Sequence, residues 1–341
     1  MPSWLDLLPA ALIAWLAVPP LARQAEGLGL VDVPSTRSTH TRPVPRIGGI
    51  AILLGLAGAL ALLALRRHPA LDAGKAWLPY VLPAVLFFAI GLADDGARLR
   101  TRTKFLFQAG VAAGAVLLGL RWGGTASGPF GAIAFGAWTP VLTWLWIVAV
   151  VTLVNFVDGI DLITAAVAVV VLGAAAGAGA GPGGGLLYLI TAAAVVGYGF
   201  WNVRPARAFP GDSATHMLGF LMASAALELP GETVALPWAA ASAPLLPGVI
   251  DVALGLLAKQ RHGVPLSRAH NQHLYQRLTY IGWSHAAVAL RYGLLAAAAL
   301  LLVAFVAPRW GLGACLGLAA PILLWHLALG LWRTRTIPYR F

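Results

Sequence analysis

The chain has 341 residues, of which 60% are hydrophobic and only 10% are charged, and its formal net charge is +11. Soluble domains carry about 25% charged residues, so the composition excludes a soluble protein and predicts an all-α, polytopic helix bundle in lipid. The apolar runs do not alternate with polar residues, which excludes a membrane β-barrel. The basic residues are spread over short loops, which argues against nucleic-acid binding. The single cysteine, Cys315, excludes an intrachain disulfide.

Apolar runs follow one another along the whole chain and predict about ten or eleven transmembrane helices. In chain order they cover residues 3–22, 47–65, 77–93, 105–120, 138–154, 162–180, 185–201, 214–229, 234–256, 286–307 and 312–332. The stretch 129–137 contains two glycines and a proline and is expected to form a loop. The glycine-rich stretch 173–185 is expected to form an outer turn.

The basic residues predict the orientation of this bundle. Seventeen Lys and Arg residues fall in the loops and the C-terminal tail on one side, and five fall in the loops on the other. The positive-inside rule therefore places the first side in the cytoplasm and the N terminus outside, in the plasma (inner) membrane. Arg23 follows the first span and no basic residue precedes it, which is the reverse of a cleaved signal peptide. We expect one domain, 1–341, whose site is formed by the inner loops 23–46, 94–104, 155–161, 202–213 and 257–285.

Acidic residues are rare in the chain, yet five aspartates gather in three of the inner segments. They are Asp94, Asp95, Asp158, Asp161 and Asp212, out of 12 acidic residues in all. Carboxylates at a membrane boundary are costly to desolvate and repel one another unless a cation lies between them. The pattern therefore predicts a divalent-metal site at the membrane surface, and the arginine-rich loops beside it are typical of phosphate chemistry.

Asp94 and Asp95 end the third predicted span, where two neighbouring carboxylates can both turn toward one site. Lys104 opens the next span and is expected to point at a bound phosphate. Between them Arg98, Arg100 and Arg102 either bind phosphate or only follow the positive-inside rule. In the opening loop Arg46 and its neighbours leave the same two alternatives open.

Two further loops carry an asparagine and aspartates. Asn155, Asp158 and Asp161 are three residues apart and share one side if this stretch is helical, although one aspartate is a natural N-cap for the next helix. Asp212 is likewise either a ligand or an N-cap.

Other residues of the 201–213 loop suit a nucleotide or a phosphate. Phe209 either stacks on a base or anchors the loop at the membrane interface. Arg204 and Arg207 are phosphate candidates.

The last inner loop holds His270 and His273 beside Arg268 and Arg277. On a helix the two histidines reach one group, which favours donors to a diphosphate. Zinc is the alternative, but no cysteine or third well-spaced histidine supports it. Asp251, near the inner face, either belongs to the site or pairs with a nearby basic residue.

In this order the segments resemble the polyprenyl-phosphate N-acetylhexosamine-1-phosphate transferases, that is, glycosyltransferase family 4. The family's motifs correspond to Asp-Val-Pro-Ser-Thr-Arg-Ser-Thr-His-Thr-Arg-Pro-Val-Pro-Arg-Ile-Gly-Gly (32–49), Asp94-Asp95, Asn-Phe-Val-Asp-Gly-Ile-Asp (155–161), Phe-Pro-Gly-Asp (209–212) and Ala-His-Asn-Gln-His-Leu-Tyr-Gln (269–276). The last form resembles the O-antigen branch, which handles deoxy-aminosugars. The chain departs from the family at Leu162-Ile163, where Gly-Leu is usual, and at Ala214, where Gly is usual.

The resemblance implies a UDP-N-acetyl sugar as donor, undecaprenyl phosphate as acceptor and Mg²⁺ (or Mn²⁺) as cofactor. The implied metal ligands are Asp212, Asn155 and Asp95, and the implied catalytic residues are Asp94, Asp95, Asp158 and Asp161. The implied substrate contacts are Lys104, Phe209, Arg207, Arg268, His270, His273, Asn202 and Arg46. Whether the protein forms a homodimer stays open.

Two other functions compete with this interpretation. A secondary transporter also has ionisable groups in the membrane, but it predicts charges deep in several spans, and only Asp251 comes close to that. A catalytically inactive relative that binds lipid phosphate is the second alternative.

Overall fold

The computed structural model describes residues 3–34, 40–72, 74–121, 125–128, 131–134, 136–177, 179–183, 185–227, 243–265, 272–302, 320, 322–324 and 326–334. Within these residues five helical segments are long and apolar enough to cross a membrane: Trp4–Gln24, Gly48–Leu65, Gly74–Ala97, Gly136–Val157 and Ala243–Arg261. Shorter apolar helices cover Ile163–Gly177, Leu186–Gly199 and His285–Leu301. The prediction of an all-α, multi-pass membrane bundle is confirmed.

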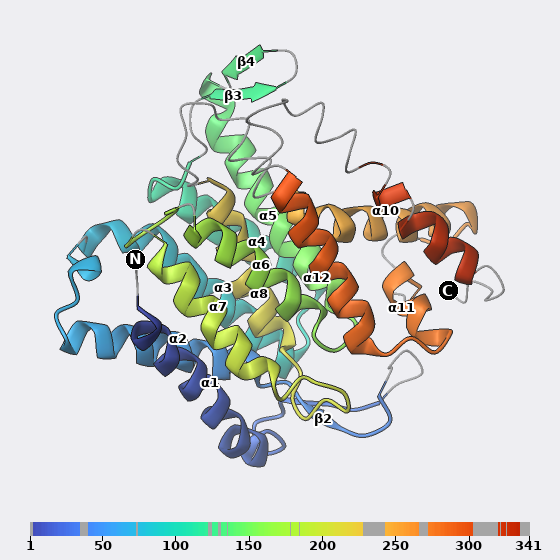
Figure 1. The fold of residues 1–341 in the computed structure, drawn as a ribbon, viewed down its shortest axis with the longest axis horizontal. Coiled ribbons are helices and arrows are strands. Elements are labelled where there is room, and N and C mark those ends of the chain that lie inside the picture. Colours follow the sequence, from blue (N-terminus) through green and yellow to red (C-terminus); the bar gives the residue numbers. More distant parts are fainter. Residues whose placement is uncertain are drawn as a thin grey trace.

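Helices dominate the element order (Figure 1). The α-helices are α1 (Trp4–Gln24), α2 (Gly48–Leu65), α3 (Leu78–Ala97), α4 (Thr101–Leu117), α5 (Thr139–Val157), α6 (Ile163–Gly177), α7 (Leu186–Gly199), α8 (Gly211–Leu227), α10 (Leu246–Arg261), α11 (Leu274–Tyr280) and α12 (His285–Leu301). Short 3-10 helices cover Pro69–Leu71, Gly74–Trp77, Gly136–Trp138 and Ala243–Leu245. Two antiparallel pairs complete the list, β1 (Val31–Asp32) with β2 (Val44–Pro45) and β3 (Thr125–Gly128) with β4 (Gly131–Ala134).

Helix α8 forms the centre of the bundle and packs against α2, α3, α5 and α6 (Figure 1). Apart from Asp212 and His216, its residues are apolar or small on all sides, which is typical of a helix with no solvent-facing side. Every residue of α8 is buried except Asp212 in its first turn. Asp212, at the start of α8, is therefore the one residue of this central helix that is accessible.

Glycines allow unusually close contacts between these helices. A β-carbon at Gly91 in α3 would lie 2.1 Å from the carbonyl oxygen of Asp212 in α8. A β-carbon at Gly197 in α7 would lie 2.0 Å from the carbonyl oxygen of Ala11 in α1. Small residues let membrane helices approach backbone to backbone. The first of these contacts brings the end of α3 against the start of α8.

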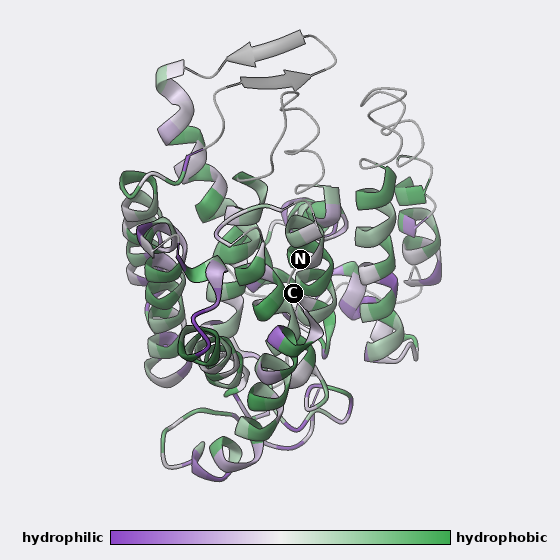
Figure 2. Cartoon of the chain, turned by 60° about the vertical axis from the view of Figure 1, so that its left-hand side comes forward, coloured by the Kyte–Doolittle hydropathy of each residue, from purple (hydrophilic) through white to green (hydrophobic). Residues whose placement is uncertain are grey.

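The motif-bearing connections gather at one end of the bundle. The Phe209 amide donates to the Pro45 carbonyl oxygen at 2.8 Å, and the Gly48 amide donates to the Phe209 carbonyl oxygen at 2.9 Å. This end lies opposite the β3–β4 hairpin (Figure 1). Figure 2 shows hydrophobic residues along most of the helices, with hydrophilic residues concentrated at helix ends and connections.

Most helix boundaries lie within a few residues of the prediction, but two differ in a way that matters. Helix α3 continues to Ala97, so Asp94 and Asp95 lie in its last turn rather than after it. The helix ends where Arg98 adopts a left-handed conformation (φ 50°) and its amide donates to the Asp94 carbonyl oxygen. Helix α8 begins at Gly211, so Asp212 is inside the helix.

The predicted loop 129–137 is wrong in part, because residues 131–134 form β4 and 136–138 a 3-10 turn. Gly128 pairs with Gly131 at the ends of the two strands. The predicted span 234–256 ends too early, since α10 continues to Arg261, and residues 234–242 lie outside the described part. Most of the predicted span 312–332, including Cys315, also lies outside it.

Candidate active site

Lys104 joins two of the predicted aspartates. Its Nζ lies 2.7 Å from Oδ2 of Asp94 and 2.9 Å from Oδ2 of Asp212. Asp94 is further fixed by the Leu99 amide, which donates to its Oδ1 at 2.7 Å. The three side chains come from α3, α4 and α8 and remain partly accessible. The ammonium lies between two like charges that would otherwise repel one another.

Asn155, near the end of α5, holds the other oxygen of Asp212. Its Nδ2 donates to Oδ1 of Asp212 at 2.9 Å and to Oγ1 of Thr215 at 3.0 Å. Both carboxylate oxygens of Asp212 therefore have a partner from another helix, which fixes the direction in which this side chain points.

Asp95 lies beneath the same group and is only 5% exposed. Its Oδ1 accepts from the Asp212 amide at 2.8 Å and its Oδ2 from the Ser213 amide at 3.0 Å. The first amides of a helix have no partner within it, so Asp95 caps α8 from outside. Gly211 (φ +74°) is needed here, because a β-carbon would lie 2.6 Å from Oδ2 of Asp95.

Asp158 lies just after α5, which ends one residue earlier. Asn155, Asp158 and Asp161 were expected to share one side only if this stretch were helical, and that condition is not met, because α5 ends before Asp158. The Thr164 hydroxyl donates to Oδ1 of Asp158 at 2.7 Å. Burial, together with the nearby Asp212 carboxylate, raises the pKa of Asp158 to about 7.

Asp161 belongs to a different part of the site. One of its carboxylate oxygens lies 3.0 Å from Nδ1 of His285, at the start of α12, and the other ring nitrogen of His285 contacts Arg204. These residues line a pocket of about 350 Å³. The lining is completed by His40, Thr41, Arg42, Val44, Pro205, Ala206 and Phe209.

Phe209 is partly buried and lies edge-on to the His40 ring, with centroids 5.0 Å apart. Its backbone is held by the hydrogen bonds to the 45–48 segment, so the ring is fixed at the pocket wall. Phe209 and Arg204, both from the 201–213 loop, thus line the same pocket.

Asn202 joins two motif segments instead of facing a pocket. Its Oδ1 accepts from the Leu162 amide at 2.7 Å, and its Nδ2 donates to the Ala208 carbonyl oxygen at 2.9 Å. The side chain is buried, so both ends of its amide serve the packing of these loops.

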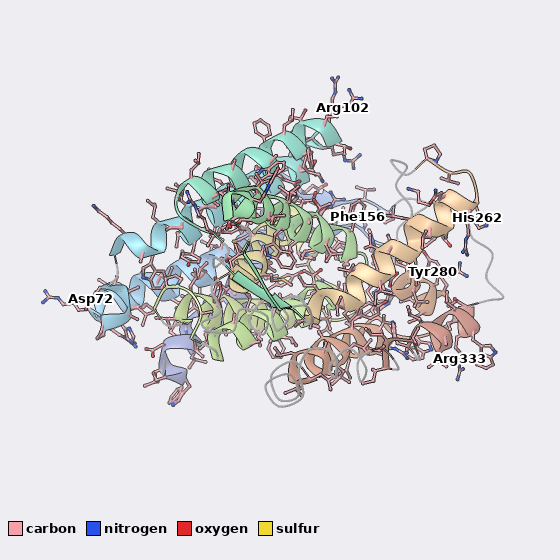
Figure 3. The ribbon with its side chains drawn as sticks, turned by 90° about the horizontal axis from the view of Figure 1, so that it is seen from above. Asp72, Arg102, Phe156, His262, Tyr280 and Arg333 are labelled. Carbon is pink, nitrogen blue, oxygen red and sulfur yellow. The ribbon has the colours of Figure 1, made fainter. Side chains whose placement is uncertain are left out.

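Three groups of predicted basic residues lie outside the Asp94–Asp212 cluster. Arg46 pairs with Asp32 at 2.5 Å, and Arg207 lies over the Trp201 ring, 5.7 Å from its centroid. Arg98, Arg100 and Arg102 are exposed, and Arg102 points away from the bundle (Figure 3). Exposure of this run agrees with a role in orienting the protein in the membrane.

His273 is the N-cap of α11 and is almost fully buried. His273 precedes the helix, so the expectation that it lies on a helix together with His270 is wrong for His273. His270 and Arg268 lie outside the described part of the chain. Arg277 is buried and donates to the Thr334 carbonyl oxygen at 2.8 Å, an interaction that braces α11 rather than facing the cluster.

The described residues contain no group of three or more His, Cys, Asp or Glu arranged to hold a metal ion. Two carboxylates, Asp94 and Asp212, nevertheless converge on one cation, the ammonium of Lys104. Carboxylate oxygens suit a hard ion such as Mg²⁺ better than zinc. The carboxylates of Asp94 and Asp212 therefore fit Mg²⁺, provided that the ion displaces the Lys104 ammonium from between them.

The chain is also similar to proteins of known family. Residues 77–229 match the model of glycosyl transferase family 4. Over 317 residues the chain is 31% identical to a decaprenyl-phosphate N-acetylglucosaminephosphotransferase of Mycobacterium tuberculosis, covering 83% of this chain and 77% of the relative. The chain belongs to glycosyl transferase family 4.

Two further relatives agree with this membership. A probable undecaprenyl-phosphate N-acetylglucosaminyl 1-phosphate transferase of Bacillus subtilis is 30% identical over 291 residues, covering 81% of this chain and 77% of the relative. An undecaprenyl-phosphate alpha-N-acetylglucosaminyl 1-phosphate transferase of Thermotoga maritima is 27% identical over 218 residues, covering 64% and 63%. The resemblance to the family is confirmed, and this family-4 chain is a membrane-bound transferase. Its assignment to the O-antigen branch stays a prediction.

Sequence reasoning missed several partners of the site. His216 is four residues after Asp212, and its Nδ1 lies 2.5 Å from the Asp212 carbonyl oxygen, a spacing that a helix brings together. That signal was available in the sequence. His285 lies 124 residues from Asp161, and no local pattern indicates their contact.

Proposed function

We propose that this transferase moves an N-acetylaminosugar-1-phosphate from a UDP-sugar to undecaprenyl phosphate. The products are undecaprenyl-diphosphate-sugar and UMP, and the reaction would initiate synthesis of a cell-envelope polysaccharide. The observation that carries the proposal is the bridge from Lys104 to Asp94 and Asp212, at one end of an apolar helix bundle. The names of the relatives support the acceptor and the group transferred.

In the proposed reaction an oxygen of the lipid phosphate attacks the β-phosphorus of the donor. The new bond joins this oxygen to the β-phosphorus, the bond from the β-phosphorus to the bridging oxygen breaks, and its electron pair leaves with UMP. Such transfers depend on in-line positioning and on neutralising phosphoryl oxygens. Lys104 supplies a positive charge at this point. Asp94 orients the attacking phosphate or takes its remaining proton, a modest role because the second phosphate pKa is about 6.

The cofactor we propose is Mg²⁺, with Mn²⁺ as a substitute. Asp212 and Asp94 would hold the ion, because their oxygens already converge on one cation. The resemblance implied Asn155 and Asp95, rather than Asp94, as ligands beside Asp212. In this structure Asn155 holds the side chain of Asp212, and Asp95 holds its backbone. When bound, the ion neutralises oxygens of the donor diphosphate.

The donor's nucleotide would occupy the pocket of about 350 Å³ beside Phe209. The ring of Phe209 would stack on the base, and Arg42 and Arg204, which also line the pocket, would contribute positive charge for the phosphates. His273, with His270 and Arg268 of the same loop, would contact the diphosphate. The count of basic residues supports a cytoplasmic site in the plasma membrane, with the N terminus outside.

A transfer assay tests the proposal. The purified protein is given undecaprenyl phosphate, Mg²⁺ and each of several radiolabelled UDP-N-acetyl sugars, and label is measured in the butanol extract. We expect label from at least one donor and its loss in Asp212→Asn, whereas Asp72→Asn, an exposed residue distant in sequence from the motifs, should keep wild-type activity. Binding of donor or acceptor without any labelled product would instead indicate an inactive relative.

A further inference from the structure

Asp251 is a buried carboxylate that the proposed reaction does not use. It lies in α10, is 1% exposed, and accepts hydrogen bonds from the backbone amides of Leu274 at 2.6 Å and Tyr275 at 2.9 Å. The Tyr292 hydroxyl, from α12, donates to the same carboxylate. A buried carboxylate is costly unless several donors satisfy it. Here the donors come from two other helices, so Asp251 fastens α10, α11 and α12 together.

The helix that Asp251 caps is short. Helix α11 has seven residues, far fewer than an isolated helix needs to be stable, so it depends on contacts with the rest of the protein. Its first two amides, which no intrahelical carbonyl can satisfy, are those that Asp251 accepts. Removing this carboxylate therefore affects the start of α11 directly.

Helix α11 in turn touches the motif that contains Asp158. A β-carbon at Gly159 would lie 2.3 Å from the Tyr275 hydroxyl oxygen and 2.6 Å from Nε2 of Gln276, so the helix presses on the backbone of this turn. The Tyr275 hydroxyl also donates to the Phe156 carbonyl oxygen at 3.3 Å. A displacement of α11 would release the turn that follows α5.

Asp251 also neighbours the end of the histidine loop. Nδ1 of His273 lies 3.7 Å from Oδ1 of Asp251, and the His273 ring is stacked on Tyr275 with an interplanar angle of 3° and centroids 5.7 Å apart. His273 is one of the residues that would contact the donor diphosphate. Asp251 thus lies beside His273 directly and reaches the Asp158–Gly159 turn indirectly, through α11.

We propose that Asp251, with Tyr292, is a positioning residue that holds His273 and the Asp158–Gly159 turn in their places in the active site. This inference rests on the proposed function for its kinetic consequence, but its structural consequence is independent of it. Asp251 acts only through α11 and its neighbours and is not itself in contact with the reacting groups.

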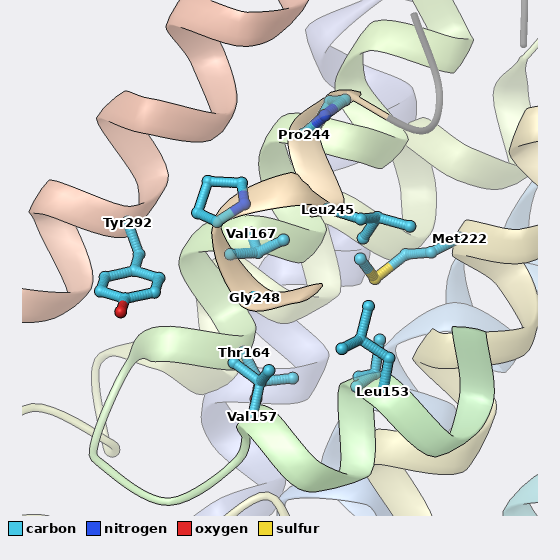
Figure 4. Close-up of a pocket in the computed structure, with 11 residues that line it drawn as sticks. Leu153, Val157, Thr164, Val167, Met222, Pro244, Leu245, Gly248 and Tyr292 are labelled. Carbon is cyan, nitrogen blue, oxygen red and sulfur yellow. The ribbon is translucent and has the colours of Figure 1, made fainter. Parts of the chain in front are cut away.

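Tyr292→Phe is the cleanest variant. The Tyr292 ring lines a small apolar pocket of about 30 Å³ between α5, α6, α8 and α10 (Figure 4). Phenylalanine keeps that ring, so the packing around the pocket is preserved and only the hydroxyl that donates to Asp251 is lost. Asp251→Asn is the stronger variant, because an amide offers only one acceptor oxygen to the two backbone amides.

Hydrogen–deuterium exchange of the full-length protein in detergent reads the positions directly. We expect both variants to speed amide exchange in residues 272–280 and 156–162, by about tenfold or more in Asp251→Asn and less in Tyr292→Phe. Exchange in α1, α2 and α7 should stay as in the wild type. Asp6→Asn is the matched control, since Asp6 caps the start of α1 through Ser3 and should leave both segments unchanged.

Kinetics supply the second readout. We expect the KM for the UDP-sugar to rise about tenfold in Asp251→Asn while the KM for undecaprenyl phosphate stays within about twofold. If the wild type transfers no sugar, the proposed function fails and the exchange result alone decides the positioning role. Unchanged exchange in both segments in Asp251→Asn overturns the proposal. If Asp251→Asn unfolds globally, Tyr292→Phe decides, and its failure to change these two segments overturns the proposal too.

Discussion

Asp95 accepts a hydrogen bond from the backbone amide of Asp212 at 2.8 Å, although the two residues are 117 positions apart in the chain. The carboxylate of one motif therefore caps the helix that carries the aspartate of another. A second buried aspartate, Asp251, caps α11 in the same manner. In both cases an acidic side chain from a membrane helix sets the place of a motif.

This relationship predicts different results at Asp95 and Asp212. In Asp95→Asn one of the two α8 amides loses its acceptor, which should lower the free energy of unfolding by about 1–3 kcal/mol and also reduce transfer. In Asp212→Asn the side chain no longer carries a charge but its backbone bonds stay, so transfer should fall with little loss of stability. Tryptophan fluorescence during thermal unfolding, with the transfer assay beside it, checks both. Equal stability losses in the two variants would contradict the assignment.

A second prediction concerns Lys104. Lys104→Met keeps the length of the side chain but removes the ammonium between Asp94 and Asp212, and we expect transfer to fall by about 100-fold or more. Because the lysine no longer competes for these carboxylates, Mg²⁺ should raise the unfolding temperature more in the variant than in the wild type. The measurement is the midpoint of thermal unfolding as Mg²⁺ is added. An equal or smaller rise in the variant would show that Lys104 and the ion do not compete.

The pKa of Asp158 gives a prediction about pH. Burial raises it from 3.8 to about 7, so the folded protein binds a proton that the unfolded chain has released. The stability that this group contributes is therefore present below about pH 4, declines as the pH rises toward 7, and is lost above pH 7. The total loss is about 1.4 kcal/mol for each unit by which the folded and unfolded pKa values differ. Asp158→Asn should be more stable than the wild type at pH 8 and equal to it near pH 4.

The pH experiment is made without divalent cations, because a bound cation would favour the charged carboxylate. Unfolding midpoints of the wild type, Asp158→Asn and the exposed control Asp72→Asn are compared at each pH. If Asp158→Asn is the less stable protein at pH 8, the carboxylate contributes to stability in its charged form and the prediction is wrong.

Leu162 offers a test of backbone strain. Its φ is +69°, in the left-handed region, and it stands where the family usually has glycine. Leu162→Gly and Leu162→Ala remove the same side-chain packing, but only glycine adopts this conformation freely. We expect the glycine variant to be more stable than the alanine variant by about 1 kcal/mol, the reverse of the usual order within regular structure. Denaturant unfolding in detergent measures the difference. A higher free energy of unfolding for Leu162→Ala than for Leu162→Gly would contradict the presence of backbone strain at this position.

Much of the fold was predictable because apolar length decides membrane spans. The run 47–65 corresponds to helix Gly48–Leu65 almost residue for residue. The end of α3 was predicted too early, since polar Asp94 and Asp95 suggested a boundary, whereas the helix ends at the left-handed Arg98. That conformation leaves no signal in a hydropathy pattern.

The candidate site was predictable in composition but not in its internal contacts. The charge count placed the aspartate segments on one side, and the structure brings Asp94, Asn155 and Asp212 together. That Asp95 caps a helix and that Asp161 meets His285 depends on tertiary packing across more than a hundred residues. No local periodicity reports such contacts.

The nucleotide released during turnover tests the central claim most directly. A transferase that moves the sugar together with its phosphate leaves UMP behind, whereas a transferase that moves the sugar alone leaves UDP. Chromatography of the reaction with undecaprenyl phosphate and the accepted UDP-N-acetyl sugar should show UMP in an amount equal to the lipid-linked sugar, and none with Asp212→Asn. Release of UDP, or UMP that forms without lipid-linked product, would contradict the account.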